Sequence, residues 1–312
     1  MKKEFVRPEI CRPPSEADSY YLPLTAGCSN HSCIFCRYYG YKMQMRDFNE
    51  VKLEIDAMHL YLTRGIKIPG MDESVYYFLQ RWDGRRIFLQ DGDALIYPYA
   101  RLVEIMRYLN EKFPHLERIA SYTDPSGTLL KTVDEFKTLK DLKLGIVYLG
   151  VESGDEELLK KIGKNVNYEQ MVAAGRKIKE AGITLSVTVL LGLGGREGSE
   201  KHALATARII SDIDSEYCGA LTLTLVPGTP LYEQAQSGQF HMITPFESLE
   251  ELKMIIENSN LTNCFFSSVH ASNYITVRGT LPADKEKMIR QIKAVLQRKD
   301  PGLLRPEYLR GL

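Results

Sequence analysis

Short apolar runs and amphipathic stretches alternate along this sequence, and the alternation limits the possible folds more than any other feature. The apolar runs are expected to form strands at residues 20–24, 86–89, 118–122, 145–152, 184–191 and 217–226. Helices are expected at residues 51–63, 99–110, 128–137, 155–162, 168–181 and 198–212. Continuous apolar strands separated by amphipathic helices are typical of a parallel sheet that is covered on both faces. The sequence therefore predicts an α/β fold.

The number of these units indicates an incomplete barrel. Six β-α units precede about residue 258, whereas a closed barrel of this type has about eight. We therefore expect a partial (β/α)6 barrel with a C-terminal extension, in which residues 263–270 add a late strand and residues 284–297 form a terminal helix. Residues 64–81 show little periodicity and are expected to be an insertion, such as a lid. The predicted division is an N-terminal extension at 1–17, the barrel at 18–260 and a substrate-capping segment with its helix at 261–312.

Three cysteines occupy one short loop after the first predicted strand. Cys28, Cys33 and Cys36 have the spacing C-x4-C-x2-C. Thiolates select iron–sulfur clusters, zinc or copper(I), and structural zinc normally takes four ligands. Three thiolates without a nearby fourth favour a [4Fe-4S] cluster with one iron left open for chemistry. The alternative is zinc in a non-enzymatic binding protein, with His31 as the fourth ligand.

Polar and glycine residues gather where the predicted strands end. In parallel α/β folds, ligands bind at the carboxyl ends of the strands. After the cysteine loop, the strand ends carry Asp91-Gly92-Asp93, Ser121, Glu152-Ser153-Gly154 and Gly192-Leu193-Gly194-Gly195. This convergence predicts one binding site at a single edge of the sheet.

Composition excludes several classes of function. The chain has 40 basic and 40 acidic residues, so it lacks the overall positive charge expected of a protein that binds large nucleic acids. No run of about 18 apolar residues predicts a membrane span. The N-terminus lacks the apolar core of a secretory signal, and the scattered Cys11, Cys218 and Cys264 do not form a disulfide framework. A cytoplasmic location is therefore expected.

The motifs together resemble the radical S-adenosylmethionine (radical SAM) superfamily over about residues 18–280. The family's commonest cysteine spacing is one residue shorter, but similar bacterial members carry comparable Gly-Cys-Ser loops. They also share three further motifs in the same order, which here are Asp91–Ala94, Gly150–Gly154 and His270–Tyr274.

The resemblance implies a [4Fe-4S] cluster on the three cysteines, with SAM bound at the open iron. A flavodoxin or ferredoxin would reduce the cluster, and SAM cleavage would give a 5′-deoxyadenosyl radical that takes hydrogen from the substrate. The implied cofactor contacts are Phe35 and Gly192 with Leu193 for adenine, Asp91, Gly92 and Asp93 for the amino group, Glu152 for the ribose, and Ser121 for the nucleoside. Ser153 is a further implied cofactor contact without an assigned group. No catalytic residue is assigned.

The late His-Ala-Ser-Asn-Tyr segment should return to the barrel mouth, so its polar residues are candidate substrate contacts. They are His270, Ser272, Asn273, Tyr274 and the nearby Arg278. The alternative for this segment is structural, with His270 as a cap and Tyr274 packed in the core.

A small molecule is the expected substrate, because no auxiliary cysteine-rich or RNA-binding module is evident. The chain also resembles the queuine-releasing lyases, which cleave the base–sugar bond of queuosine 5′-phosphate. This implies a C–N lyase that acts on a modified nucleoside or nucleotide in queuosine salvage. An activase of a glycyl-radical partner and a coproporphyrinogen-oxidase-like enzyme remain alternatives.

Overall fold

The computed structural model describes residues 5–311. Its main sheet has eight strands in the order β1-β4-β5-β6-β7-β8-β9-β10. Within the described part of the chain, no helix is long and apolar enough to cross a membrane. The chain divides into two compact units, which are described separately. One comprises Met1–His31, Tyr41–Tyr148 and Lys177–Thr184, and the other comprises Ser32–Gly40, Leu149–Arg176 and Leu185–Leu312.

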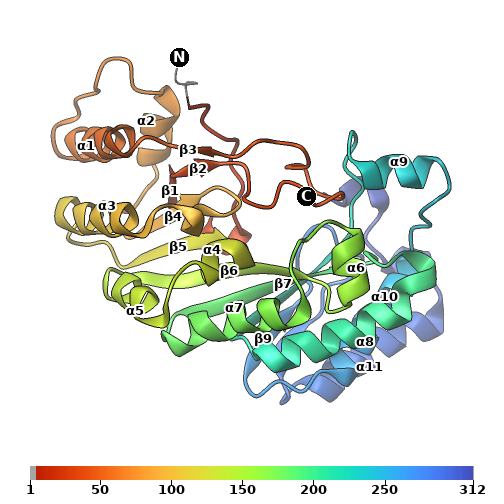
Figure 1. Cartoon of the computed structure of the whole chain (residues 1–312). Helices are drawn as coiled ribbons and strands as arrows, with labels where there is room; N and C mark the ends of the chain where they lie inside the picture. The colour runs from red at the N-terminus through yellow and green to blue at the C-terminus, as the bar shows by residue number, and fades with distance from the viewer. Residues whose placement is uncertain (1–4, 312) are drawn as a thin grey trace. The chain divides into compact units, whose positions relative to one another are not determined.

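The first unit is built on parallel strands with helices packed against them. Strands β1, β4 and β5 pair in parallel, with Tyr20 opposite Ile87 and Ile87 opposite Ile119. Helix α1 packs beside α2 and α3, and α3 beside α5 (Figure 1). The elements are η1 (Pro14–Glu16), β1 (Tyr20–Pro23), β2 (Thr25–Ala26), β3 (Gln44–Met45), α1 (Phe48–Arg64), α2 (Glu73–Leu79), β4 (Arg86–Gln90), η2 (Ala94–Ile96), α3 (Tyr99–Lys112), β5 (Arg118–Thr123), α4 (Pro125–Leu129), α5 (Val133–Asp141) and the first part of β6 (Leu144–Glu152).

The second unit continues this pattern and adds an antiparallel edge. Strands β7, β8 and β9 pair in parallel, and β10 pairs antiparallel with β9. Helix α10 packs against α8 and α11 (Figure 1). The elements are the end of β6, α6 (Glu156–Lys161), α7 (Tyr168–Glu180), β7 (Thr184–Leu191), α8 (Gly195–Ile213), β8 (Tyr217–Thr222), α9 (Pro230–Gln236), α10 (Pro245–Asn258), β9 (Cys264–Ser267), β10 (Arg278–Leu281), α11 (Lys285–Arg298), η3 (Pro301–Leu303) and η4 (Glu307–Leu309).

The predicted α/β class with a partial barrel and a C-terminal extension is confirmed. Strands β1 and β4 to β8 are the six predicted barrel strands, and β9, β10 and α11 form the extension. The predicted division into three segments stays a prediction.

Two local predictions need correction. The unperiodic stretch at 64–81 contains α2, a seven-residue helix that is capped by Asp72 and too short to show a helical period. The single helix expected at 128–137 is two helices, because the side chain of Thr132 forms a capping box with Glu135 and starts α5 there.

Candidate cofactor site

The cysteine loop begins and ends at a short ribbon in the first unit. Strand β2 pairs antiparallel with β3, and the amide of Arg46 donates to the carbonyl of Leu24 at 2.9 Å. Gly27 follows β2 with a φ of 91°, and a Cβ there would lie 2.7 Å from the ring of Tyr41. Glycine is therefore required at the point where the chain turns into the cysteines.

A buried ionic cluster supports this ribbon, and we call it the Glu54 cluster. The carboxylate of Glu54 in α1 accepts from Arg7 at 2.8 and 3.0 Å, from Arg46 at 2.5 Å and from the hydroxyl of Tyr20 at 2.6 Å. Burial alone would raise the pKa of Glu54, but the two guanidinium groups lower it below its ordinary value. The Glu54 cluster therefore holds Arg46, which lies between β3 and α1 in the segment that follows the cysteine loop.

The predicted Asp-Gly-Asp turn lies against the same ribbon. The amide of Gly27 donates to Asp91 Oδ2 at 3.0 Å, and the amide of Gly92 donates to the carbonyl of Gly27 at 3.1 Å. Asp93 Oδ2 accepts from the hydroxyl of Ser29 at 2.6 Å, and Asp93 Oδ1 accepts from Thr123 at 3.2 Å. The structure thus brings Asp91, Gly92 and Asp93 together with the residues that flank Cys28.

Asp93 is a buried carboxyl group with hydroxyl partners. Burial raises its pKa to about 7, and the neighbouring charge of Asp124 acts in the same direction, although the hydrogen bond from Ser29 opposes it. A cationic group beside Asp93 would favour the ionised form. The position therefore suits an ammonium ligand.

Ser121 is fully buried on β5, and its hydroxyl donates to the carbonyl of Tyr122 at 2.8 Å. Its neighbours Ala120 and Tyr122 pack in one cluster with Phe88 and Tyr148. Alternation along the strand places Ser121 on the opposite face from this aromatic cluster. Its predicted contact with the nucleoside stays a prediction.

In the second unit, residues 162–165 hold the other half of the cysteine loop, and we call this segment the 162–165 clamp. The amide of Ile34 donates to the carbonyl of Ile162 at 2.9 Å, and the hydroxyl of Ser32 donates to the carbonyl of Gly163 at the same distance. Asn165 donates to Ser32 at 2.5 Å. Gly163 has a φ of 76°, and a Cβ there would lie 2.2 Å from the carbonyl oxygen of Ser32. Only glycine permits this approach.

Glu152 and Lys164 form a shielded ion pair near Cys36. Lys164 Nζ lies 3.5 Å from Glu152 Oε1, and the two side chains are only 7% and 13% exposed. Glu152 has a φ of 62°, and its carboxylate lies where a side chain on Gly150 would be, since a Cβ there would be 2.3 Å from Oε1. Burial raises the pKa of the Cys36 thiol, whereas the charge of Lys164 lowers it.

Sequence reasoning missed Lys164. It lies in the run Lys160-Lys161-Ile162-Gly163-Lys164, which resembles an exposed helix end. The available signal was the glycine just before it, which ends the helical stretch and turns the chain.

Two of the predicted adenine contacts, Phe35 and Leu193, share one apolar cluster. Leu193 is buried there with Leu158 and Leu223, and Phe35 packs against the same group. The structure therefore brings together residues from the cysteine loop and from the turn after β7.

Ser153 and Gly192, from the ends of β6 and β7, are joined by two buried helix side chains. His202 Nδ1 in α8 lies 2.8 Å from the hydroxyl of Ser153, and its Nε2 lies 2.9 Å from the carbonyl of Leu190. Glu251 in α10 accepts from the amide of Gly192 at 2.6 Å and lies 3.5 Å from His202 Nε2. Neither helix residue was predicted from the sequence, because the local pattern of α8 and α10 does not indicate which helix residues reach the strand ends.

The predicted substrate segment follows the carboxyl end of β9. Asn273 is 3% exposed, and its amide donates to the carbonyls of Ala220 and Ser268 while its oxygen accepts from Thr222. The hydroxyl of Ser272 accepts from the amide of Thr222. These contacts give both side chains a role in fixing the end of β8.

The remaining predicted substrate residues differ in exposure. His270 is half-buried, and burial, assisted by Arg305, lowers its pKa. The hydroxyl of Tyr274 is bonded to Glu307 and Arg310 at 2.6 Å. Arg278 is exposed on β10, opposite Ser267. Substrate contact by any of these residues stays a prediction.

Cys33 is buried, and Cys28 and Cys36 are half-buried. Among residues 5–311, no three His, Cys, Asp or Glu side chains form a group that could bind a single metal ion. A cube spreads three thiolates over three irons. The donor set of soft thiolates fits an iron–sulfur cluster, and its assignment to these cysteines stays a prediction.

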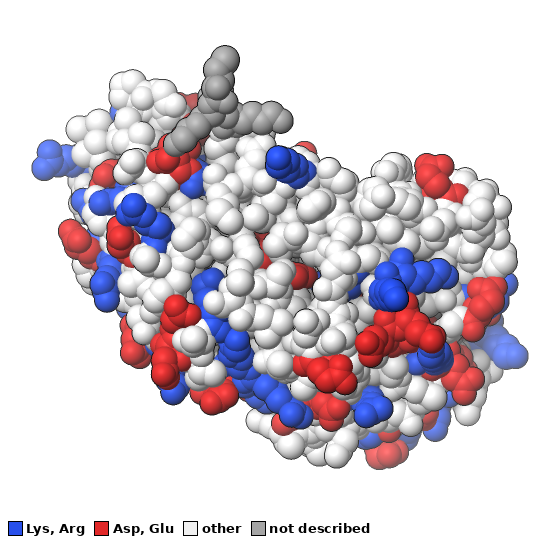
Figure 2. All heavy atoms as spheres, viewed as in Figure 1, with Lys and Arg blue, Asp and Glu red and all other residues white. Residues whose placement is uncertain are grey.

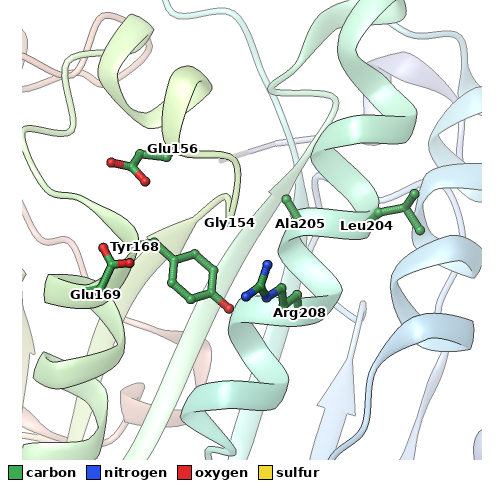
Figure 3. Close-up of a pocket in the computed structure, with 7 residues that line it drawn as sticks. All are labelled: Gly154, Glu156, Tyr168, Glu169, Leu204, Ala205 and Arg208. Atoms are coloured by element: carbon green, nitrogen blue, oxygen red, sulfur yellow. The ribbon is translucent and has the colours of Figure 1, made fainter.

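A separate pocket lies in the second unit and shares Gly154 with the predicted strand-end motifs. It has a volume of about 440 Å³ and is lined by Gly154, Glu156, Tyr168, Glu169, Leu204, Ala205 and Arg208. Figure 3 shows the guanidinium of Arg208 directed toward Tyr168, and it lies 5.3 Å from the centre of that ring. The hydroxyl of Tyr168 donates to Asp212 at 2.6 Å, so these polar groups already have protein partners.

Comparison with known proteins places these features in a family. The heme chaperone HemW of Bacillus subtilis is 21% identical over 227 residues, which are 72% of this chain and 56% of HemW. A tRNA-2-methylthio-N(6)-dimethylallyladenosine synthase of Nitrosomonas europaea is 24% identical over 226 residues, which are 70% of this chain and 46% of that protein. The chain thus spans about half the length of these curated relatives.

Solved structures share the fold. Coproporphyrinogen III oxidase (HemN) from Escherichia coli has a TM-score of 0.52 and 15% identity, and the match covers 77% of this chain and 51% of HemN. The radical SAM methyltransferase TsrM from Kitasatospora setae has a TM-score of 0.53 and 20% identity, over 71% of this chain and 39% of TsrM. The sequence profile of the radical SAM superfamily matches residues 22–207, which is more than half of the chain. This chain therefore belongs to the radical SAM superfamily, whose members use a [4Fe-4S] cluster and SAM.

Proposed function

We propose that this chain binds a [4Fe-4S] cluster through Cys28, Cys33 and Cys36 and cleaves SAM reductively there. The cluster and SAM together supply one-electron cleavage of a sulfonium C–S bond, which yields methionine and a 5′-deoxyadenosyl radical. The observation that carries the proposal is the 162–165 clamp, which holds Ser32 and Ile34 on either side of Cys33. A loop fixed on both sides of a ligand is preorganised to bind a cluster.

The charged groups of each unit support this proposal. In the first unit, Asp93 is positioned to accept the ammonium of SAM, because its hydroxyl partners leave the buried carboxyl without full charge compensation. In the second unit, Glu152 is positioned to accept from ribose hydroxyls. Lys164 would orient that carboxylate, because its ammonium lies 3.5 Å from Glu152 Oε1.

Anaerobic reconstitution tests the proposal directly. The loaded protein should bind iron and sulfide as a cubane cluster and form 5′-deoxyadenosine and methionine when a reductant such as dithionite or flavodoxin is supplied. Cys28→Ala, Cys33→Ala and Cys36→Ala should each abolish SAM cleavage, whereas Cys11→Ala should retain it. Binding of zinc with no cubane absorbance, or cleavage retained in one of the three variants, would contradict the assignment.

We further propose that the substrate is a modified nucleotide and that the reaction is C–N lysis of queuosine 5′-phosphate to release queuine. Support comes from two arginines that approach the His270–Tyr274 segment. Arg305 donates to the carbonyl of His270 at 3.1 Å, and Arg310 donates to that of Ser272 at 2.7 Å. Guanidinium groups suit phosphate recognition. The His270–Tyr274 segment also contacts the carboxyl end of β8.

Product analysis tests the substrate. Queuosine 5′-phosphate should yield queuine only with SAM and reductant present, and deuterium on the ribose should transfer to 5′-deoxyadenosine. Queuosine without the phosphate should react less well if Arg305 or Arg310 binds that group. SAM cleavage without any queuine release would leave the family assignment intact and exclude this substrate.

The match to HemW over 72% of this chain favours one further candidate, a haem-binding role. Titration of the purified protein with haemin distinguishes it. A stoichiometric Soret shift would support haem binding, and an unshifted spectrum would exclude it.

A further inference from the structure

Two fully buried ionisable side chains in the second unit lie outside every predicted motif. They are His202 in α8 and Glu251 in α10, and both are 0% exposed. Burial raises the pKa of Glu251, and the hydrogen bond from the amide of Gly192 opposes this. Buried charged groups are costly unless they are hydrogen-bonded, so the contacts of this pair identify what it holds in place.

Glu251 holds the turn after β7. Its Oε1 accepts from the amide of Gly192 at 2.6 Å, and its other oxygen accepts from the hydroxyl of Ser199. The φ of Gly192 is 81°. The hydrogen bond from its amide to the side chain of Glu251 helps to hold this backbone conformation. The next residue, Leu193, packs in the apolar cluster that includes Phe35.

His202 connects this turn to the end of β6. Because the carbonyl of Leu190 can only accept, Nε2 of His202 carries the proton of that 2.9 Å hydrogen bond. In the neutral ring, Nδ1 then accepts from the hydroxyl of Ser153 at 2.8 Å. The amide of Asp155 donates to the same hydroxyl at 3.0 Å, so the contact reaches the start of α6.

Helix α6 completes the connection. Asp155 caps its beginning, and the 162–165 clamp follows its last residue, Lys161. The clamp binds Ser32 and Ile34 in the cysteine loop. A continuous series of hydrogen bonds and one short helix therefore joins the glycine turn of β7 to that loop.

We propose that Glu251, His202 and Ser153 form a positioning relay that keeps the nucleoside end of the SAM site in register with the cysteine loop. Glu251 and His202 act through the backbone and touch no substrate, so they are positioning residues and not catalytic residues. The inference rests on the proposed use of SAM, and it adds two residues from α8 and α10 that no strand-end motif contains.

Affinity for SAM separates positioning from general stability. In the anaerobically reconstituted protein, Glu251→Ala should weaken SAM binding about tenfold, since it leaves the amide of Gly192 without its buried acceptor. Glu251→Gln should stay within about threefold of the natural protein, because the amide oxygen can still accept that bond. His202→Gln can keep the donor to Leu190 but loses Ser153, and it should give an intermediate loss. The matched control is Ser211→Ala, which removes the hydrogen bond from the amide of Asn260 to α8 and should leave SAM affinity unchanged.

A second readout needs no cofactor and no activity. Hydrogen exchange of the protein without cluster should accelerate in Glu251→Ala at residues 192–195, at the start of α6 and in the 162–165 clamp. The control should accelerate exchange only near the junction of α8 and α10. If Glu251→Ala folds, binds SAM normally and loses only thermal stability, the relay is structural and the proposal is wrong. If the natural protein itself binds no SAM, the proposed function is wrong, and the relay proposal, which rests on it, is wrong as well. If Glu251→Ala does not fold, His202→Gln and Glu251→Gln decide between the same outcomes.

Discussion

The two halves of the cysteine loop are anchored by different physical means. In the first unit, the Glu54 cluster fixes the segment that follows the cysteine loop. One carboxylate there compensates the positive charges of Arg7 and Arg46. In the second unit, the 162–165 clamp uses backbone hydrogen bonds and the small size of Gly163. The ionic anchor should lose stability when its carboxylate is removed, whereas the glycine anchor should lose stability when a side chain is added at Gly163.

Surface charge does not explain this difference. Where charged side chains occur on the visible face, Figure 2 shows Lys and Arg beside Asp and Glu, and the chain has equal numbers of both signs. The charges that matter for the loop are the buried ones, because burial removes the screening that weakens pairs in water.

The largest expected effect on stability is that of Glu54→Ala. The change leaves two partly buried guanidinium groups without their carboxylate and should lower the free energy of unfolding by about 3–5 kcal/mol. Urea denaturation measures it. The control is Glu50→Ala, which removes a 54% exposed partner of Arg46 and should cost no more than about 1 kcal/mol. Equal losses in the two variants would show that the cluster does not anchor the loop.

Gly163→Ala tests the other anchor. Its matched control is Gly238→Ala, because both glycines have a φ of 76° but a Cβ at Gly238 meets nothing within 4 Å. Both variants should lose about 1–2 kcal/mol from backbone strain, and Gly163→Ala should lose about 1–3 kcal/mol more from the overlap with Ser32. It should also lower iron content after reconstitution. Iron content equal to that of the control would contradict a role of the clamp in cluster binding.

Asp93 should make stability depend on pH in a defined direction. Its folded pKa of about 7 exceeds the ordinary value of 3.8. The stability it contributes is therefore complete below the unfolded value and is lost as pH rises toward the folded value. From about pH 5 to pH 7.5, the free energy of unfolding of Asp93→Asn should rise by about 2–3 kcal/mol relative to that of the natural protein. Urea unfolding at several pH values measures the gap.

The control for Asp93 is Asp134→Asn, which changes an 88% exposed carboxylate. The difference in free energy of unfolding between this variant and the natural protein should not change with pH. A gap at Asp93 that does not change with pH would mean that the buried carboxyl is compensated by a cation already present in the fold. Saturation with SAM should reduce the pH dependence if the ammonium of SAM binds there.

The smallest expected effect is that of Lys164→Gln. Loss of the ammonium removes the partner of Glu152 and should weaken SAM binding by about threefold, on the scale of one partly shielded ion pair. Lys160→Gln, an exposed change four residues earlier, should have no effect. Calorimetric titration of SAM compares them, and equal affinities would exclude Lys164 from the site.

Strands and long helices were predictable because their apolar periodicity is local. Strand β7 has the predicted bounds, and α3 exceeds its prediction by two residues at its end. Helix α2 and the ribbon of β2 and β3 were missed, because a seven-residue helix and two-residue strands carry no period that a sequence window can detect. Their positions depend on tertiary contacts such as the Glu54 cluster.

Part of the candidate site was predictable as well. Asp91 and Asp93 follow a strand, and their carboxylates do meet the base of the cysteine loop. The helix residues His202 and Glu251 were not predictable, since nothing in their local sequence indicates which strand end they reach. Lys164 lies in the loop after α6, and only the preceding Gly163 marked that turn.

The sequence by itself determined the α/β class, the superfamily and the spacing of the three cysteines, because strand periodicity and cysteine spacing are properties of neighbouring residues. Only the tertiary structure decided how the cysteine loop is supported and which buried charges face one another. Those contacts join segments tens to hundreds of residues apart, and their energies depend on burial and distance, which no local pattern encodes.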